Sequence, residues 1–269
     1  MKYTFGFIGT GNMGSALAQA ASKTVDPQNI ILSNRTPSKA EALASRLGCC
    51  SGSNSLAAAE SRYLFLAVKP QMMADMLSGI SGDLRQRTDS FVLVTIAAGL
   101  TIARIRELAG ADYPVIRIMP NTPCAIGSGV ILCSRSDNVS DGDYENFKQM
   151  MQGAGTLIDL SENLIDAGSA ISGCGPAYVY VFLEALADAG VACGLTRADA
   201  KKLAAATVRG SAELAMVSDK HTAQLKDEVC SPGGSTIEGV LRLENGGFRG
   251  TVADCVKASF EKNKSLGKN

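Results

Sequence analysis

Three of the four glycines within the first fourteen residues of this 269-residue chain stand at a spacing that suits phosphate binding. A short apolar run, Thr4–Ile8, leads directly into Gly9-x-Gly11-x-x-Gly14, and a helical pattern follows. In this order, the first glycine permits a tight turn, the second lets a pyrophosphate approach the backbone, and the third lets the helix pack on the strand. The free N–H groups of the first helical turn then face the phosphates. The pattern predicts a dinucleotide site that includes Gly9, Thr10, Gly11, Asn12, Met13 and Gly14.

The end of the second predicted strand, Asn29–Leu32, indicates which dinucleotide is bound. An NAD site usually carries Asp or Glu there, which accepts a hydrogen bond from the ribose 2′-hydroxyl. This chain has Ser33-Asn34-Arg35-Thr36 instead, without an acid. The Arg35 guanidinium can bind a 2′-phosphate through two nitrogens, and its two neighbours Asn34 and Thr36 can donate to it. These residues favour NADPH, with NADH as the alternative; without a cofactor role, Arg35 would be a solvated surface arginine.

Further candidates follow other predicted strands, at the carboxyl ends where open α/β sheets bind ligands. Ala67-Val68-Lys69-Pro70 ends the third strand, and its lysine either reaches the cofactor or is solvated. Ala97-Ala98-Gly99 ends the fourth, where small side chains leave space for a nicotinamide ring. Met119-Pro120-Asn121-Thr122-Pro123 ends the fifth. Its two prolines predict an extended loop that holds Asn121 and Thr122 rigidly, with a plain proline turn as the alternative.

Two loops with glycines precede helical patterns in the second half of the chain. Ser172-Gly173-Cys174-Gly175-Pro176-Ala177-Tyr178 enters a long apolar helix. Ser231-Pro232-Gly233-Gly234-Ser235-Thr236 enters a helix near the C-terminus. Bare N–H groups at a helix N-terminus, together with hydroxyls, form a carboxylate receptor that needs no arginine. The second loop is therefore a candidate substrate site, and an ordinary capping loop is the alternative.

Composition excludes several classes of protein. Lys+Arg and Asp+Glu both number 26, so the formal net charge is zero, and the basic footprint of a nucleic-acid binder is missing. The eight cysteines form no C-x-x-C pair and His221 is the only histidine, so no metal site is expected. No cationic and apolar leader pattern precedes the first strand, so a cytoplasmic location is expected. The apolar stretch Pro176–Ala192 contains Glu184 and Asp188, which predicts a core helix rather than a membrane span.

The elements that must position these residues follow two different patterns. Strands and helices alternate up to about residue 160, which predicts a mainly parallel sheet with helices on both faces and final strands that can run antiparallel. The strands are expected at Thr4–Ile8, Asn29–Leu32, Tyr63–Ala67, Phe91–Thr95, Val115–Met119, Gly129–Cys133 and Thr156–Asp159. The helices between them are expected at Gly11–Ser22, Pro37–Leu47, Asn54–Ala59, Met72–Leu84, Ile102–Ala109 and Asp141–Met151.

Beyond residue 160 the pattern predicts helices alone. They are expected at Glu162–Ala170, Gly175–Cys193, Arg197–Val217, Thr222–Glu228, Ser235–Glu244 and Phe248–Leu266. Thr196 is a predicted N-cap after the helix stop at Gly194. The fold class is therefore α/β: a Rossmann-type dinucleotide-binding domain over 1–160, followed by an all-α domain over 161–269. Alanine-rich helices with Gly175 and Gly190 can approach closely, which suits an interlocked dimer.

In their order along the chain, these segments resemble the pyrroline-5-carboxylate reductase family. The resemblance rests on the glycine loop, Asn34-Arg35, Ala67–Pro70, Met119–Pro123, Ser172–Tyr178, Leu225–Val229, Ser231–Thr236 and Leu243–Phe248, and it covers essentially the whole chain. Two departures are mild: Cys174 stands where serine is common in the family, and Ser235 where threonine or alanine is common.

The resemblance implies an oxidoreductase of proline biosynthesis that reduces 1-pyrroline-5-carboxylate to L-proline with NAD(P)H. It implies a helical dimerisation domain, with dimers that often assemble into decamers. It places Asn54 near the adenosine ribose and the Met119–Pro123 loop near the nicotinamide. In the mechanism we expect, Ser231, the amides of Gly233 and Gly234, and Ser235 hold the substrate carboxylate, and Thr236 hydrogen-bonds the ring nitrogen. The cofactor site would comprise the glycine loop with Asn34, Arg35, Thr36, Asn54, Ala67, Val68, Lys69, Pro70, Ala97 and Asn121.

Two other functions fit parts of the pattern. A β-hydroxyacid dehydrogenase has the same two-domain plan, but it needs a lysine on the interdomain helix to handle the hydroxyl proton, and the stretch 173–189 contains none. A non-catalytic NADPH-binding sensor would bind cofactor without turnover. The intact Ser231–Thr236 loop argues against a sensor.

Overall fold

The chain forms two compact units in a computed structural model that describes residues 1–266. Unit 1 comprises Met1–Cys174 together with the chain from Ser259 onward, and unit 2 comprises Gly175–Ala258. The contacts thus divide the chain later than the predicted boundary at 160/161, because helix α7 (Ile165–Ser172) packs on strand β7 of unit 1. The division of the chain into a dinucleotide-binding domain over 1–160 and a substrate-binding and dimerisation domain over 161–269 stays a prediction.

Unit 1 is built on one eight-stranded sheet of order β3-β2-β1-β4-β5-β6-β7-β8. Its strands are β1 (Tyr3–Ile8), β2 (Ile30–Ser33), β3 (Cys50–Ser51), β4 (Ser61–Leu66), β5 (Val92–Thr95), β6 (Val115–Pro120), β7 (Gly129–Arg135) and β8 (Gly155–Asp159). The first six are parallel, β7 is antiparallel to β6, and β8 is parallel to β7. The predicted reversal at the end of the sheet is therefore confirmed. Strand β3 was not predicted, since two residues carry no periodicity.

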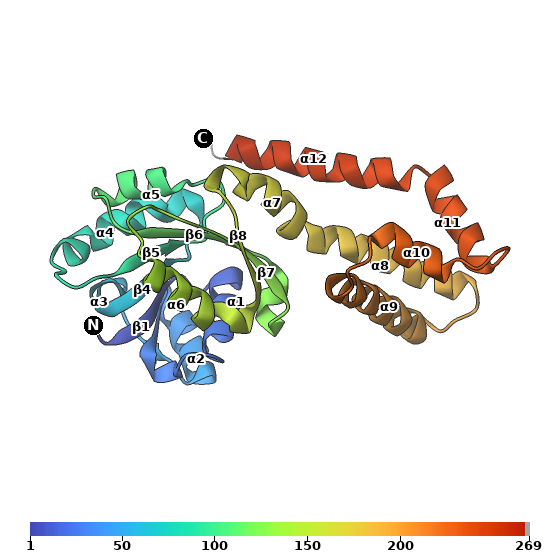
Figure 1. Cartoon of the computed structure of the whole chain (residues 1–269). Coiled ribbons are helices and arrows are strands. Elements are labelled where there is room, and N and C mark those ends of the chain that lie inside the picture. The colour runs from blue at the N-terminus through green and yellow to red at the C-terminus, as the bar shows by residue number, and fades with distance from the viewer. Residues whose placement is uncertain (267–269) are drawn as a thin grey trace. The chain divides into compact units, whose positions relative to one another are not determined.

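Helices cover both faces of this sheet, as the alternating pattern predicts (Figure 1). One face carries α1 (Asn12–Ala21), α2 (Pro37–Leu47) and α6 (Asp141–Met151), and the other carries α3 (Asn54–Glu60), α4 (Met73–Arg85) and α5 (Ile102–Ala109). Successive strand residues point to opposite faces. Phe65 of β4 consequently belongs to the core beneath α1, whereas Leu64 and Leu66 belong to the core beneath α4. The carboxyl ends of β1, β2, β4 and β5 are thereby held at one edge.

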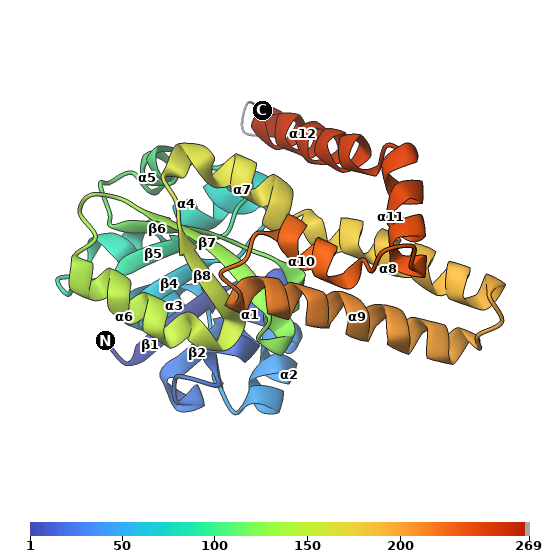
Figure 2. The ribbon, with the colours of Figure 1, turned by 45° about the vertical axis from the view of Figure 1, so that its right-hand side comes forward.

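Unit 2 is entirely helical within the residues that the structure describes. It contains α8 (Gly175–Ala192), α9 (Arg197–Val217), α10 (Thr222–Val229), α11 (Ser235–Asn245) and the first part of α12 (Phe248–Leu266). Helices α8 and α9 run side by side (Figure 2). They approach closely at Gly190, where an added Cβ would lie 3.2 Å from the Ala200 Cβ. The predicted N-cap is confirmed, since the Thr196 hydroxyl accepts from the Asp199 N–H at 3.2 Å.

The prediction that the apolar helix is a core helix is wrong for a single copy of the chain. Of α8, only Ala187 is buried, and Val181 is 68% exposed. Its apolar residues cover most of its circumference, while α9 packs on one side only, so within unit 2 several of its apolar side chains stay exposed. The stretch Glu162–Ala192 is also long and apolar enough to span a membrane, but a single stretch of this kind is weak evidence for a membrane span.

Candidate active site

The glycine loop between β1 and α1 has the backbone geometry that its sequence predicts. Gly9 has φ of +110°, and a Cβ there would lie 2.3 Å from the Ala67 carbonyl oxygen. A Cβ on Gly14 would lie 2.2 Å from the Gly9 carbonyl oxygen. Around Gly11, by contrast, nothing lies within 4 Å of the Cβ position. Two glycines therefore serve the turn and the packing, and the third leaves open space above the helix N-terminus.

Hydrogen bonds hold this loop against the end of β2. The Thr10 N–H donates to Asn34 Oδ1 at 3.2 Å, and Asn34 Nδ2 donates to the Thr36 carbonyl at 3.1 Å. The Ser15 hydroxyl donates to the Thr10 carbonyl at 3.0 Å. The Thr10 hydroxyl is buried and makes no hydrogen bond with any residue that the structure describes. An unpaired buried hydroxyl costs free energy, so a polar group of a bound phosphate at this position would satisfy it.

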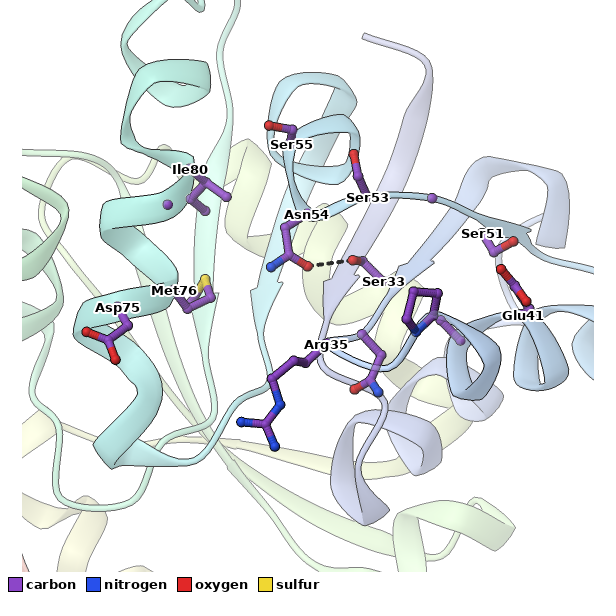
Figure 3. Close-up of a pocket in the computed structure, with 15 residues that line it drawn as sticks. Ser33, Arg35, Glu41, Ser51, Ser53, Asn54, Ser55, Asp75, Met76 and Ile80 are labelled. Atoms are coloured by element: carbon purple, nitrogen blue, oxygen red, sulfur yellow. Dashed lines mark hydrogen bonds between the residues drawn. The ribbon is translucent and has the colours of Figure 1, made fainter.

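Two adjoining cavities open beside the loop. The first has a volume of about 540 Å³ and is lined by Ile8, Gly9, Thr10, Gly11, Asn34, Arg35, Thr36, Lys39, Asn54, Ala67, Val68, Lys69, Met72, Asp75 and Met76. The second, shown in Figure 3, has a volume of about 590 Å³ and shares Asn34, Arg35, Asn54, Asp75 and Met76 with the first. Together they offer enough room for the adenosine half of a dinucleotide. The structure therefore brings together most of the predicted cofactor residues, while Asn12, Met13, Gly14, Pro70, Ala97 and Asn121 line neither cavity.

The charges of the first cavity suit an anionic ligand. Arg35, Lys39 and Lys69 line it, and none of them forms an ion pair among residues 1–266. Asp75 of α4 is the one carboxylate in its lining. Figure 3 shows the Arg35 side chain extending from the end of β2 toward α4. Three unpaired cations against one acid match the charge of a phosphorylated cofactor.

Asn54 stands at the start of α3 beside the end of β2. Its Oδ1 accepts a hydrogen bond from the Ser33 hydroxyl, drawn as a dashed line in Figure 3. Within the described part of the chain, its Nδ2 makes no hydrogen bond, so that amide remains to donate to a ribose oxygen. Asp75 and Met76 were missed by sequence reasoning because α4 follows the glycine loop by sixty residues and no local motif marks them.

The loop after β6 differs from its prediction in one respect. Asn121 is extended, but Thr122–Ile126 forms a short 3₁₀ helix, so the prediction of an extended Thr122 is wrong. Pro123 fits the first turn of a helix as well as an extended loop, since it lacks the N–H that such a turn leaves unpaired. Asn121 is 7% exposed. Its Nδ2 donates to the Ser172 carbonyl at 2.9 Å and its Oδ1 accepts from the Val130 N–H at 2.9 Å, so its predicted cofactor role stays a prediction.

In unit 2, the second glycine-containing loop forms the N-terminus of α11. Gly233 has φ of +67°, and Gly234 is the N-cap without a side-chain capping bond. The Gly234 N–H donates to the Ser231 carbonyl at 3.0 Å, and a Cβ on Gly234 would lie 2.3 Å from the Ser231 hydroxyl. Ser235 and Thr236 are exposed in the first turn. The loop thus presents uncapped N–H groups and three hydroxyls, which can bind a carboxylate.

Among the described residues, no cluster of His, Cys, Asp and Glu could hold a metal ion. The only histidine, His221, is the N-cap of α10, where its Nδ1 accepts from the Ala223 N–H at 3.1 Å. The geometry of the glycine loop suits a dinucleotide and that of the α11 loop suits a carboxylate, a combination compatible with a reduction in which the protein binds and orients the reactants.

Two family models match the chain. The model described as pyrroline-5-carboxylate reductase dimerisation matches residues 162–266. The model described as NADP oxidoreductase coenzyme F420-dependent matches residues 4–99. The first covers the helical region, and the second covers the glycine loop and strands β1 to β5.

Relatives of known name and structure match over the full length. Pyrroline-5-carboxylate reductases from Corynebacterium melassecola and Escherichia coli are 37% and 38% identical to the chain, and each alignment covers at least 99% of both proteins. The crystal structure of a Plasmodium falciparum pyrroline carboxylate reductase with NADP bound superposes with a TM-score of 0.87 at 36% identity over 99% of each chain. A Coxiella burnetii pyrroline-5-carboxylate reductase superposes with a TM-score of 0.91 at 28% identity over 100% of each chain. The chain belongs to the pyrroline-5-carboxylate reductase family.

Proposed function

We propose that this protein is an NADPH-dependent reductase that converts 1-pyrroline-5-carboxylate to L-proline, the last step of proline biosynthesis. The observation that carries the proposal is the presence of both loops, one for a dinucleotide and one for a carboxylate, in a chain that matches enzymes of this name over its whole length. A β-hydroxyacid dehydrogenase has less support, because α8 contains no lysine to handle a hydroxyl proton.

The residues around the glycine loop fit NADPH. The open space at Gly11 and the unpaired Thr10 hydroxyl would accept the pyrophosphate. Arg35, with Lys39 beside it in the cavity lining, would bind the 2′-phosphate, and Asn54 would donate to the adenosine ribose. When bound, this cofactor supplies the hydride.

The α11 loop would bind and orient the imine. Ser231, the Gly233 and Gly234 amides, and Ser235 would hold the carboxylate at the helix N-terminus. Thr236 would hydrogen-bond the ring nitrogen as that atom gains its lone pair. A cyclic imine can arrive protonated, so the reaction needs no acid–base dyad from the protein. Its rate would depend on positioning.

We also propose that the enzyme is a cytoplasmic homodimer that can assemble further, up to a decamer, with no membrane or nucleic-acid partner. The match of residues 162–266 to a dimerisation model and the uncovered apolar surface of α8 support the dimer. The zero net charge argues against nucleic acid.

The decisive test is NADPH oxidation at 340 nm with 1-pyrroline-5-carboxylate, repeated with NADH and, in the reverse direction, with a hydroxyacid. We expect turnover with the imine, faster with NADPH than with NADH. Cofactor binding without imine turnover would favour the sensor, and oxidation of the hydroxyacid would favour the dehydrogenase.

A further inference from the structure

A buried arginine in the middle of β6 pairs with two acids from later in the chain. Arg117 is 3% exposed. Its Nη1 lies 3.3 Å from Glu162 Oε1 and its Nη2 lies 3.3 Å from Asp166 Oδ1. Burying a guanidinium is costly unless it is paired. Each acid pairs with a different terminal nitrogen, so both are needed to pair Nη1 and Nη2, while the buried Nε has no hydrogen-bond partner among the described residues.

The two acids tie further segments to the same point. Glu162 Oε1 also accepts from the N–H of Ile102, the first residue of α5, at 2.7 Å. The Asp166 carbonyl accepts from Asn263 Nδ2 of α12 at 3.1 Å. The cluster of Arg117, Glu162 and Asp166 thus connects β6, the start of α5, the start of α7 and the C-terminal part of α12.

This cluster lies where the chain enters and leaves unit 2. Helix α7 is the last helix of unit 1 before Gly175, and the chain returns to unit 1 at Ser259, four residues before Asn263. Asp166 therefore contacts both connections. It is itself a residue of α7, which leads into unit 2, and its main-chain carbonyl accepts the bond from Asn263 on the returning chain, while its carboxylate pairs with Arg117.

Arg117 itself is buried, while the side chains of Glu162 and Asp166 are 30% and 31% exposed. A residual space of about 10 Å³ remains among Ala98, Gly99, Met119, Asp166, Ser169 and Asn263. Ala98 and Gly99 follow β5, at the sheet edge where open α/β folds bind their ligands. A change in the cluster is consequently transmitted to that edge as well as to the two connections.

We propose that Arg117 is a positioning residue for the reduction: it fixes the points on unit 1 from which both connections to unit 2 depart. The proposal rests on the proposed function, in which the dinucleotide loop belongs to unit 1 and the carboxylate loop to unit 2. Transfer between groups on different units depends steeply on their alignment. Arginine suits this position because its planar group holds Nη1 and Nη2 in a fixed geometry, one toward each carboxylate, whereas a lysine would have to reach both carboxylates from a single nitrogen.

The test compares Arg117→Lys with Arg87→Lys. Arg87 is a matched control, since its side chain is also 3% exposed and pairs with Asp89, while its other bonds go to the Ala58 and Ser61 carbonyls, away from α7. We expect Arg117→Lys to lower kcat/KM for the imine by about 10–100-fold while the NADPH Kd, measured by fluorescence titration, stays within twofold. Arg87→Lys should leave both values within twofold, although both variants lose thermal stability.

Asp166→Asn provides a second variant if Arg117→Lys does not fold, and it should lower kcat/KM in the same direction. Equal kcat/KM for the folded Arg117 or Asp166 variant and the Arg87 control would overturn the proposal, because the cluster would then be structural only. A rise in the NADPH Kd of the Arg117 or Asp166 variant as large as its fall in kcat/KM would also overturn the proposal, because the loss would then lie in cofactor binding. Absence of imine turnover in the unmodified enzyme would instead contradict the proposed function, so the two failures are distinguishable.

Discussion

Single residues of the cofactor loop divide into those that the fold uses and those that it leaves for a ligand. Gly9 and Gly14 have no room for a side chain. The side-chain amide of Asn34 is already hydrogen-bonded to the backbone of its neighbours. The Thr10 hydroxyl and the Arg35 guanidinium have no partner among residues 1–266. Substitution of such unpaired groups should change cofactor affinity more than it changes the free energy of unfolding.

Replacement of Arg35 by alanine should weaken NADPH binding selectively. A charge-assisted hydrogen bond contributes about 1.5–3 kcal/mol, which corresponds to a loss of about 10–100-fold in affinity. The NADH affinity should change little, since NADH lacks the 2′-phosphate. The measurement is the ratio of kcat/KM for the two cofactors, with Arg46→Ala as a control on an exposed arginine of α2 outside both cavities. Equal losses for both cofactors would refute the assignment.

Replacement of Thr236 by alanine should lower kcat by about 10–10³-fold, the range for removal of one transition-state hydrogen bond. NADPH binding should be intact because Thr236 belongs to the α11 loop. Steady-state kinetics and a cofactor titration give the two values. Thr222→Ala, at another exposed threonine in a first helical turn of unit 2, should have no effect. An unchanged kcat in Thr236→Ala would remove this residue from the mechanism.

At the scale of elements, the β1–α1 unit depends on how closely its helix approaches the turn. A Cβ at position 14 would overlap the Gly9 carbonyl, whereas one at position 11 would meet no protein atom. The two glycines of one motif therefore have different physical roles, one in packing and one in ligand access.

Gly11→Ala and Gly14→Ala should separate these roles. Gly11 has φ of −71° and ψ of −174°, which alanine adopts readily, so Gly11→Ala should keep the wild-type Tm and lose NADPH affinity by at least about tenfold through a clash with the pyrophosphate. Gly14→Ala should lower the free energy of unfolding by about 1–3 kcal/mol. Thermal melts and cofactor titrations of both variants provide the check. Stable Gly14→Ala protein would show that the helix can shift without cost.

The ion pair between Arg62 of β4 and Asp143 of α6 should make the free energy of unfolding depend on pH in the acidic range. Burial opposes ionisation of Asp143, but hydrogen bonds from Arg62 and Ser140 outweigh it and hold the pKa of this carboxyl below its ordinary value. A pKa that is lower in the folded state stabilises the protein above the unfolded pKa of about 3.9, and this contribution is lost as the pH falls through the folded value.

The Tm should therefore decline as the pH falls below about 4, and Asp143→Asn should reduce that decline. At neutral pH, the variant should be less stable by about 0.5–1 kcal/mol. Asp137→Asn is the control, since the Asp137 side chain is 93% exposed. Identical pH profiles for the Asp143 variant and the wild type would show that the pair contributes nothing.

At the scale of the whole molecule, the helical unit is incomplete as a single copy. Val181 and Tyr180 of α8 are 68% and 59% exposed, and Met216 of α9 is 76% exposed. Large apolar side chains that stay this exposed on neighbouring helices favour an interaction surface. A second copy is the partner that fits the family to which the chain belongs.

Val181→Asp should accordingly prevent dimer formation. A charge in an apolar interface is unpaired and costs several kcal/mol, enough to shift a micromolar or tighter dimer to monomer. Light scattering coupled to gel filtration measures the mass. Leu56→Asp, at a 41% exposed leucine of unit 1, should stay dimeric. A wild-type protein that elutes as a monomer at all concentrations would contradict the dimer.

Short-range patterns determined much of this protein from its sequence alone. The strand–glycine–helix order, the helix stop at Gly194 and the N-cap at Thr196 depend on φ angles, hydrogen bonds and periodicity among neighbouring residues. Those features appear in the structure where they were predicted. The family and its two-part fold follow from the same local motifs taken in order.

Only the tertiary structure decided how distant side chains are used. The Arg117 pairs join residues 45 and 49 positions apart, and the Asn121 bond to Ser172 spans 51. No local pattern marks such contacts, because they depend on the path of the chain between the partners. The exposure of α8 likewise has no local cause. Its apolar sequence predicts burial, but only the packing of other helices or of another protein against it determines whether it is buried.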